Sequence, residues 1–192
     1  MKKQMKFQKI VCLVNLITAA VAFFFSLGLL TDIYKLLFAV GIPGNKLYKE
    51  MQPFNKDLVR RCIIMIVLAA SLFVTRTQIR RRYYISNYIM LSASALANLT
   101  FSLISIFKIL GYRHRFLTEV NFELWRSRLE ELPDLPYTES TLWLDLNIAV
   151  LSLVIVASLL LVANLVWKIK MMKFEDRLLS GEIKPGDLQS EV

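Results

Sequence analysis

The chain has 192 residues, of which 56% are hydrophobic, and its 24 Lys and Arg against 15 Asp and Glu give a formal charge of +9. This apolar composition is unlike that of an ordinary soluble domain, and the connecting segments are too short to form a separate soluble domain of typical size. The cations flank apolar stretches and form no aromatic–basic nucleic-acid motif, so we expect anionic lipid headgroups, and no nucleic acid, as the charged partner.

Four long apolar stretches organise the chain, at residues 10–30, 58–75, 84–110 and 142–167. A helix of about 20 apolar residues crosses a hydrocarbon core roughly 30 Å thick, and only a helix satisfies its own backbone there. The sequence therefore predicts an all-α, polytopic membrane protein. Its single domain, residues 1–192, is a bundle of four antiparallel transmembrane helices.

The placement of basic residues predicts the orientation of the chain. Lys and Arg crowd the N-terminus, the turn between spans two and three, and the start of the 168–192 tail: Lys2, Lys3, Lys6, Lys9, Arg76, Arg80, Arg81, Arg82, Lys168, Lys170 and Lys173. Since basic residues close to span ends favour the cytoplasm, we expect both termini to be cytoplasmic. The outer loops lack cysteine, which fits a bacterial cytoplasmic membrane.

The first outer loop begins with an apolar segment whose role the sequence leaves open. Residues 31–40 either extend span one or re-enter the membrane. Gly41-Ile42-Pro43-Gly44 then ends any helix, because glycine and proline at this spacing interrupt helical structure.

Span two is the least regular of the four. Its charge-free part, Cys62–Thr75, is only about 21 Å long at roughly 1.5 Å per residue, so a crossing helix must include Arg60 and Arg61. One interpretation is that both arginines snorkel to the outer headgroups. The other is that one of them pairs with Asp145, which lies about one turn inside span four.

Span three carries the most polar face. Asn87, Ser94, Asn98, Ser102 and Ser105 are separated by seven, four, four and three residues and so share one side of a helix. A polar stripe faces other helices in preference to lipid. We interpret it as a helix-packing surface, and the competing hypothesis is a translocation pathway.

The second outer loop contains an amphipathic pattern over residues 116–132. Phe122, Trp125, Leu129 and Leu132 share one helical face, with Thr118 as the expected cap. Such a short amphipathic helix can lie on the membrane surface, pack over the mouth of the bundle, or dock a partner.

The sequence contains no pattern that indicates catalysis, a metal site or a bound cofactor. Its single histidine, His114, lies between two arginines, and Cys12 and Cys62 are too far apart for a disulfide or a zinc site. Ser105 and Lys108 have the spacing of a Ser/Lys dyad, but a lysine at a helix end is usually an anchor at the headgroups. We expect a protein that is not an enzyme.

Two classes of function remain. The first is a non-enzymatic accessory subunit that docks another membrane protein through the span-three face or the outer amphipathic helix. The second is a small transporter or channel that works as a homo-oligomer, because four thin helices leave little room for a pathway inside one chain.

Overall fold

A computed structural model describes residues 2–30, 45–75, 85–129 and 138–181 of the chain. Within these ranges the protein is almost entirely α-helical and has no β-strand, which confirms the all-α prediction. The helices are α1 (Lys2–Gly28), α3 (Asn45–Val74), α4 (Ile85–Glu119), α5 (Phe122–Leu129) and α6 (Leu142–Leu179).

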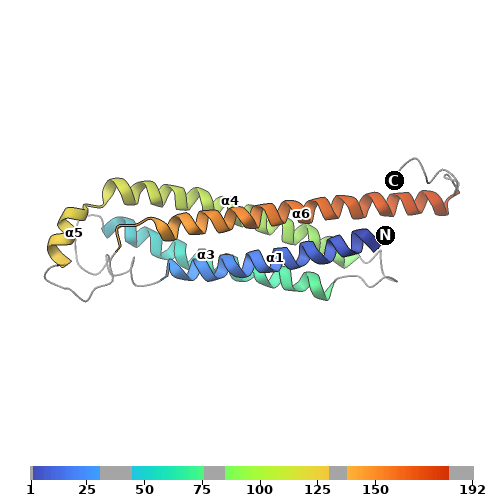
Figure 1. The fold of residues 1–192 in the computed structure, drawn as a ribbon, viewed down its shortest axis with the longest axis horizontal. Helices are drawn as coiled ribbons and strands as arrows, with labels where there is room; N and C mark the ends of the chain where they lie inside the picture. The colour runs from blue at the N-terminus through green and yellow to red at the C-terminus, as the bar shows by residue number, and fades with distance from the viewer. Residues whose placement is uncertain (1, 31–44, 76–84, 130–137, 182–192) are drawn as a thin grey trace.

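The four long helices lie side by side. α1 packs against α3 and α6, and α4 packs against the same two helices, so α1 lies diagonally opposite α4 and α3 diagonally opposite α6. Consecutive long helices run in opposite directions along the elongated molecule (Figure 1). We call the end where α1 begins and α6 finishes the inner end, and the end that holds α5 the outer end.

Three of these helices are long and apolar enough to cross a membrane: α1 from Lys3 to Gly28, α4 over its whole length, and α6 from Leu142 to Leu178. The described part of the chain thus gives one span fewer by this measure than the sequence analysis predicts. The exception is α3, in which Asp57, Arg60 and Arg61 leave only a short charge-free run before the helix ends at Val74.

The long helices direct their aliphatic side chains outward. Exposed apolar residues occur along all four of them, among them Ile10, Leu13, Ile17, Phe24, Ile64, Val67, Leu96, Leu103, Phe107, Leu153, Val156 and Leu159. A soluble helical bundle has the opposite pattern, with its polar face in water. An apolar exterior around a more polar interior is suited to lipid.

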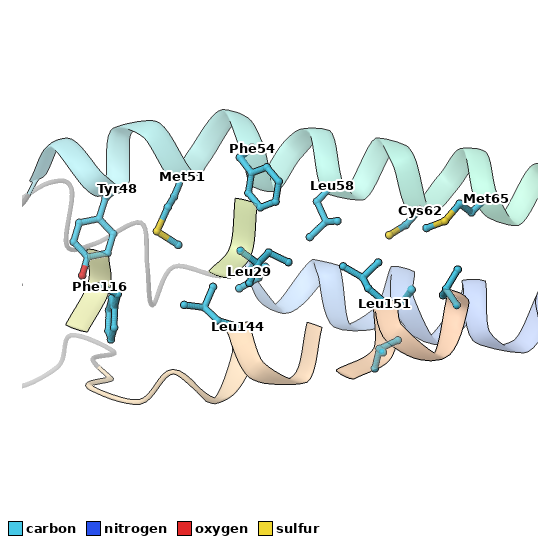
Figure 2. Packing of buried hydrophobic residues seen from close by; sticks show 14 of the residues in the cluster. Leu29, Tyr48, Met51, Phe54, Leu58, Cys62, Met65, Phe116, Leu144 and Leu151 are labelled. Atoms are coloured by element: carbon cyan, nitrogen blue, oxygen red, sulfur yellow. The ribbon is translucent and has the colours of Figure 1, made fainter. Parts of the chain in front are cut away.

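A continuous apolar face holds α3 against its neighbours. Tyr48, Met51, Phe54, Leu58, Cys62 and Met65 recur at helical spacing and point toward Leu29, just after α1, and Leu144 and Leu151 on α6 (Figure 2). Lipid tails are as apolar as leucine, so van der Waals packing stabilises the part of this contact that lies within a membrane. This packing holds α3 against α1 and α4 even though α3 carries Asp57, Arg60 and Arg61.

The helices extend beyond the predicted spans. α4 continues from the predicted limit at residue 110 to Glu119, and α6 continues from residue 167 to Leu179. At roughly 1.5 Å per residue, α4 with 35 residues and α6 with 38 residues are about 22 Å and about 27 Å longer than a hydrocarbon core of about 30 Å. Their ends therefore reach past the hydrocarbon core of a membrane that they cross.

Some predictions concern residues that the structure does not describe. These are residues 31–40, the basic turn 76–82, Leu132, and residues 182–192 of the tail, which all lie outside the described ranges.

We predict that Gly28→Ala lowers the stability of the protein by about 1–3 kcal/mol, the usual cost of overpacking. A Cβ atom at Gly28 would lie 2.6 Å from Cε3 of the Trp143 ring on α6, so the ring or the helix must move. Thermal unfolding in detergent measures the effect.

Gly111→Ala is the matched control, because a Cβ atom there has no heavy atom within 4 Å. An alanine at this helical position should stabilise the protein by roughly 0.5–1 kcal/mol. Equal melting temperatures for the two variants would contradict the proposed close approach of α1 and α6.

Candidate functional site: a buried polar seam

The polar stripe predicted on span three lies entirely inside the molecule. Asn87, Ser94, Asn98, Ser102 and Ser105 of α4 each have a relative exposure of 0%. The stripe extends over about 27 Å of helix, at roughly 1.5 Å per residue, which is close to the thickness of a hydrocarbon core. All five positions face other helices of the same chain.

The centre of the stripe joins two helices that lie diagonally opposite one another. Nδ2 of Asn98 on α4 donates a hydrogen bond of 2.8 Å to Oδ1 of Asn15 on α1. Nδ2 of Asn15 in turn donates to Oγ of Ser94 over 3.5 Å. These bonds are formed within one chain, so the central stripe is part of the internal packing and does not lie on an outer surface.

A larger polar cluster at the inner end connects all four long helices through Asn87. Oδ1 of Asn87 accepts hydrogen bonds from Nε2 of Gln8 on α1, over 3.3 Å, and from Nζ of Lys168 on α6. Nδ2 of the same side chain donates to the carbonyl oxygen of Thr75, just after α3, over 3.1 Å. One asparagine on α4 therefore has partners on or next to each of the other three helices.

Sequence reasoning missed two glutamines of this cluster. Nε2 of Gln4 donates to Oδ1 of Asn164 on α6 over 3.0 Å and lies 3.4 Å from Oε1 of Gln8. Both glutamines are about 5% exposed. They lie among the lysines of the N-terminal segment, but Gln4, Gln8 and Asn15 follow a helical spacing of four and seven that indicates one buried face.

Lys168 also differs from its expected role as a basic residue beside the headgroups. Its side chain is only 7% exposed, and its ammonium group lies 4.6 Å from the centroid of the Tyr88 ring. A cation over an aromatic face gains electrostatic stabilisation that grows when water is excluded. Lys168 therefore belongs to the internal cluster, one helical turn beyond Asn164 on the same face of α6.

We call this set of buried residues the polar seam. From the inner to the outer end it comprises Lys168, Asn164, Gln4, Gln8, Asn87, Asn15, Ser94, Asn98, Ser102 and Ser105. At its outer limit, Nη1 of Arg61 on α3 donates to Oγ of Ser105 over 3.2 Å. A positively charged side chain therefore stands at each end of the seam.

The hypothesis that Arg60 or Arg61 pairs with Asp145 is corrected by the structure. Oδ1 of Asp145 accepts a 2.6 Å bond from Arg113 on α4, and its Oδ2 accepts from Thr141 over 2.7 Å. Arg60 instead forms an exposed pair of 3.1 Å with Asp57. The reason is the helix arrangement: α4 packs on α6, whereas α3, which carries both arginines, lies diagonally across from it.

The amphipathic pattern at residues 116–132 is divided between two helices. Residues 116–119 finish α4, and α5 begins at Phe122 after Oδ1 of Asn121 accepts a 3.1 Å bond from the backbone N–H of Leu124. Asn121 is therefore the N-terminal cap, and Thr118, the expected cap, instead donates to the carbonyl oxygen of His114 within α4.

Part of the apolar face of α5 is used inside the molecule. The Phe122 ring lies 5.4 Å from that of Phe116, and Leu124 packs against the same apolar cluster. Glu123, Arg126 and Ser127 of the same helix are exposed to solvent. Of the three readings of this helix, the contacts of Phe122 and Leu124 match packing over the end of the bundle.

Ion pairs fix the outer ends of α3 and α4 to one another. Arg115 binds Glu50 of α3 over 2.5 Å and Glu119 of its own helix over 2.7 Å. The hydrogen bonds from Arg115 lower the pKa of Glu119, which lies at the exposed end of α4 beyond the predicted span. This carboxylate is therefore ionised at neutral pH.

The seam consists of neutral amides and hydroxyls with Lys168 at one end and Arg61 bound at the other, a composition that suits hydrogen bonding between helices. In the described ranges, no group of three or more His, Cys, Asp or Glu lies close enough to hold a metal ion. Ser105 and Lys108 do not meet, because Ser105 accepts from Arg61 while the ammonium of Lys108 lies 5.8 Å from the Phe54 ring centroid. Cys12 and Cys62 lie in two separate apolar clusters.

Comparison with protein families, with curated proteins and with solved structures finds no match to this chain.

We predict that Asn98→Leu lowers stability by roughly 0.6–2 kcal/mol, the range measured for hydrogen bonds between membrane helices. The variant loses its bond to Asn15 and leaves that acceptor unpaired. Because both residues belong to one chain, thermal stability in detergent should fall while the oligomeric size stays constant.

Thr100→Leu is the control for this change, since Thr100 is an exposed position on the same helix at a similar depth. It should leave the melting temperature nearly unchanged. A shift of Asn98→Leu to smaller particles would show that Asn98 joins chains, contrary to the internal contact described here.

The pairing of Asp145 with Arg113 predicts a specific energetic coupling. In a double-mutant cycle, Asp145→Asn and Arg113→Gln should couple by about 0.2–1 kcal/mol, as partly exposed ion pairs do. Asp145→Asn and Arg61→Gln should be additive within roughly 0.3–0.5 kcal/mol. A larger coupling with Arg61 than with Arg113 would restore the earlier hypothesis.

Proposed function

We propose that this chain is an integral membrane protein that acts as a non-enzymatic interaction subunit and docks another membrane protein at its outer end. One observation carries the proposal: the polar side chains of the seam are directed at one another inside the chain. The outward faces of the long helices are mainly apolar. Specific polar contacts with a partner are therefore available mainly where the helices extend past the hydrocarbon.

In this proposal α3 is the fourth span. Its apolar face packs between α1 and α4 over the length of the helix, which supports a position at the same depth as theirs. Its two arginines can be accommodated in different ways. Arg61 turns inward to Ser105, while the exposed Arg60 can extend its charged end toward the outer headgroups.

The proposed membrane is a bacterial cytoplasmic membrane, with both termini in the cytoplasm. In this orientation the inner end carries Lys3, Lys6 and Lys9 of α1 and Lys170 and Lys173 of α6, all of them exposed. Clusters of lysine beside a span attract anionic headgroups. Anionic lipid is thus the proposed partner of the inner end.

The proposed docking surface is the polar side of α5 with the adjoining end of α4. Phe122 and Leu124 hold α5 on the bundle, and Arg126 binds Glu139 over 2.6 Å near the start of α6. A helix held in this way is already ordered before a partner arrives, which reduces the entropic cost of binding. The exposed side chains that remain for a partner, such as Glu123, are polar.

A small transporter or channel is the second proposal, and the length of the seam is the observation that favours it. A buried polar path of about 27 Å nearly matches the hydrocarbon thickness. The path lies inside one chain, so a transporter built on it needs no polar axis between protomers. This differs from the homo-oligomeric axis that the sequence suggested.

Affinity purification in mild detergent separates the two proposals. A stoichiometric membrane-protein partner that is lost on Glu123→Arg, and kept in the inner-end control Lys173→Glu, supports the docking subunit. A chain that purifies without a partner contradicts it and favours the second proposal. Glu123 and Lys173 are both exposed, so neither change disturbs the core.

The proposed topology predicts the activity of reporter fusions. A reporter that is active only outside the cytoplasm should be silent when fused after Val192. It should be active when inserted near Gly44 or after Pro133, because those positions lie in the two outer loops of the proposal. The opposite pattern would overturn the orientation that the basic residues predict.

A further inference from the structure

Two buried oxygen atoms in the middle of the seam have no hydrogen-bond partner within the described chain. They are Oδ1 of Asn98 and Oγ of Ser102. Both residues have a relative exposure of 0%. They are four residues apart on one face of α4, so their Cβ atoms are about 5–6 Å apart.

The hydrogen-bond network fixes which atom of Asn98 remains unpaired. Nδ2 of Asn98 donates to Oδ1 of Asn15, and Nδ2 of Asn15 donates to Ser94. With Asn15 oriented to donate to Ser94, turning over the Asn98 amide would bring two carbonyl oxygens face to face, and neither could donate. The unpaired atom is therefore an acceptor that requires a donor.

Ser102 differs from serines on the other three long helices. Ser26, Ser71, Ser152 and Ser158 each donate to a backbone carbonyl three or four residues earlier, over 2.6–2.8 Å. This is the usual way in which a serine hydroxyl is satisfied in a membrane helix. The hydroxyl of Ser102 does not form this bond and is available to donate to another group beside Asn98.

We infer that Asn98 and Ser102 bind one water molecule at the centre of the bundle. The water donates one hydrogen to Oδ1 of Asn98 and accepts the hydroxyl hydrogen of Ser102. A group that both donates and accepts is needed, and a single water spans two polar atoms on successive helical turns. Buried waters typically bridge otherwise unsatisfied polar groups in this way. The inference is independent of the proposed docking function.

Charged ligands fit this position less well than water. A hard cation requires about six oxygen ligands, whereas two neutral oxygens are available here, and Arg61 and Lys168 stand at the two ends of the seam. An anion would meet the carbonyl oxygen of Asn98, which cannot donate a hydrogen bond. The Asn98 oxygen and the Ser102 hydroxyl are therefore best matched by a neutral molecule that both donates and accepts a hydrogen bond.

The water extends the hydrogen-bonded path of the seam. Ser94, Asn15 and Asn98 are already connected, and the water carries this connection one turn further, to Ser102. Ser105, the next residue of the stripe, is bonded to Arg61. The seam then has polar contacts along most of its length without a charged group in its middle.

Water-edited solid-state NMR of the full-length protein in lipid bilayers tests the inference. The side-chain amide of Asn98, identified by the loss of its signal in Asn98→Leu, should receive magnetisation from water in the parent protein. Absence of this transfer in the parent would overturn the inference without any further variant. A shift of the Asn98 signals on addition of Na⁺ would overturn it in favour of a cation.

Ser102→Val places a methyl group where the hydroxyl lies and should reduce the transfer to Asn98 several-fold. Ser92→Val is the matched control, because Ser92 is exposed on the same helix, and its transfer should equal that of the parent. Circular dichroism confirms that each variant keeps its helicity. If Ser102→Val does not fold, density for a water between the two oxygens in a high-resolution structure of the parent decides the question.

Discussion

The structure depends on one constraint: a polar group that is buried among apolar helices must find its partner inside the bundle, on another helix or on an enclosed water. In hydrocarbon no water replaces a missing hydrogen bond, and an unsatisfied amide costs several kcal/mol. Asn87 meets this constraint with partners from α1, α6 and the residue after α3. No two-helix hairpin of this chain could supply these partners, so the buried amides make the four helices interdependent.

The same constraint explains how two of the helices end. The carbonyl groups of a last helical turn have no partner within the helix. Nδ2 of Asn55 on α3 donates to the carbonyl oxygen of Leu29 after α1, over 2.8 Å, and Asn87 on α4 does the same for Thr75 after α3. In each case an asparagine of the following helix binds the end of the preceding one. These contacts fix neighbouring helices in register as well as side by side.

The sequence predicted those parts of the fold that repeat with the helical period. The spacing from Asn87 to Ser105 indicated one face, and that face is buried. Spacing alone could not find the partners of a charged residue. Asp145 is equally consistent with an arginine on α3 or on α4, and only the packing of α4 on α6 selects Arg113. The inner cluster was missed for another reason: Gln4 and Lys168 lie among solvated lysines, so local charge concealed their burial.

The positive charges at the two ends of the seam limit which molecules can enter the interior of the bundle. The ammonium of Lys168 at the inner end and the guanidinium of Arg61 at the outer end are held by neutral oxygens of Asn87 and Ser105. Charge–charge interactions are strong in a medium of low dielectric constant, so two fixed cations oppose the entry of a third from either side. An interior of this kind is suited to holding helices together and, at most, to small neutral molecules. The proposed docking of a partner therefore rests on the helix ends, where Glu119 and Glu123 are exposed to solvent.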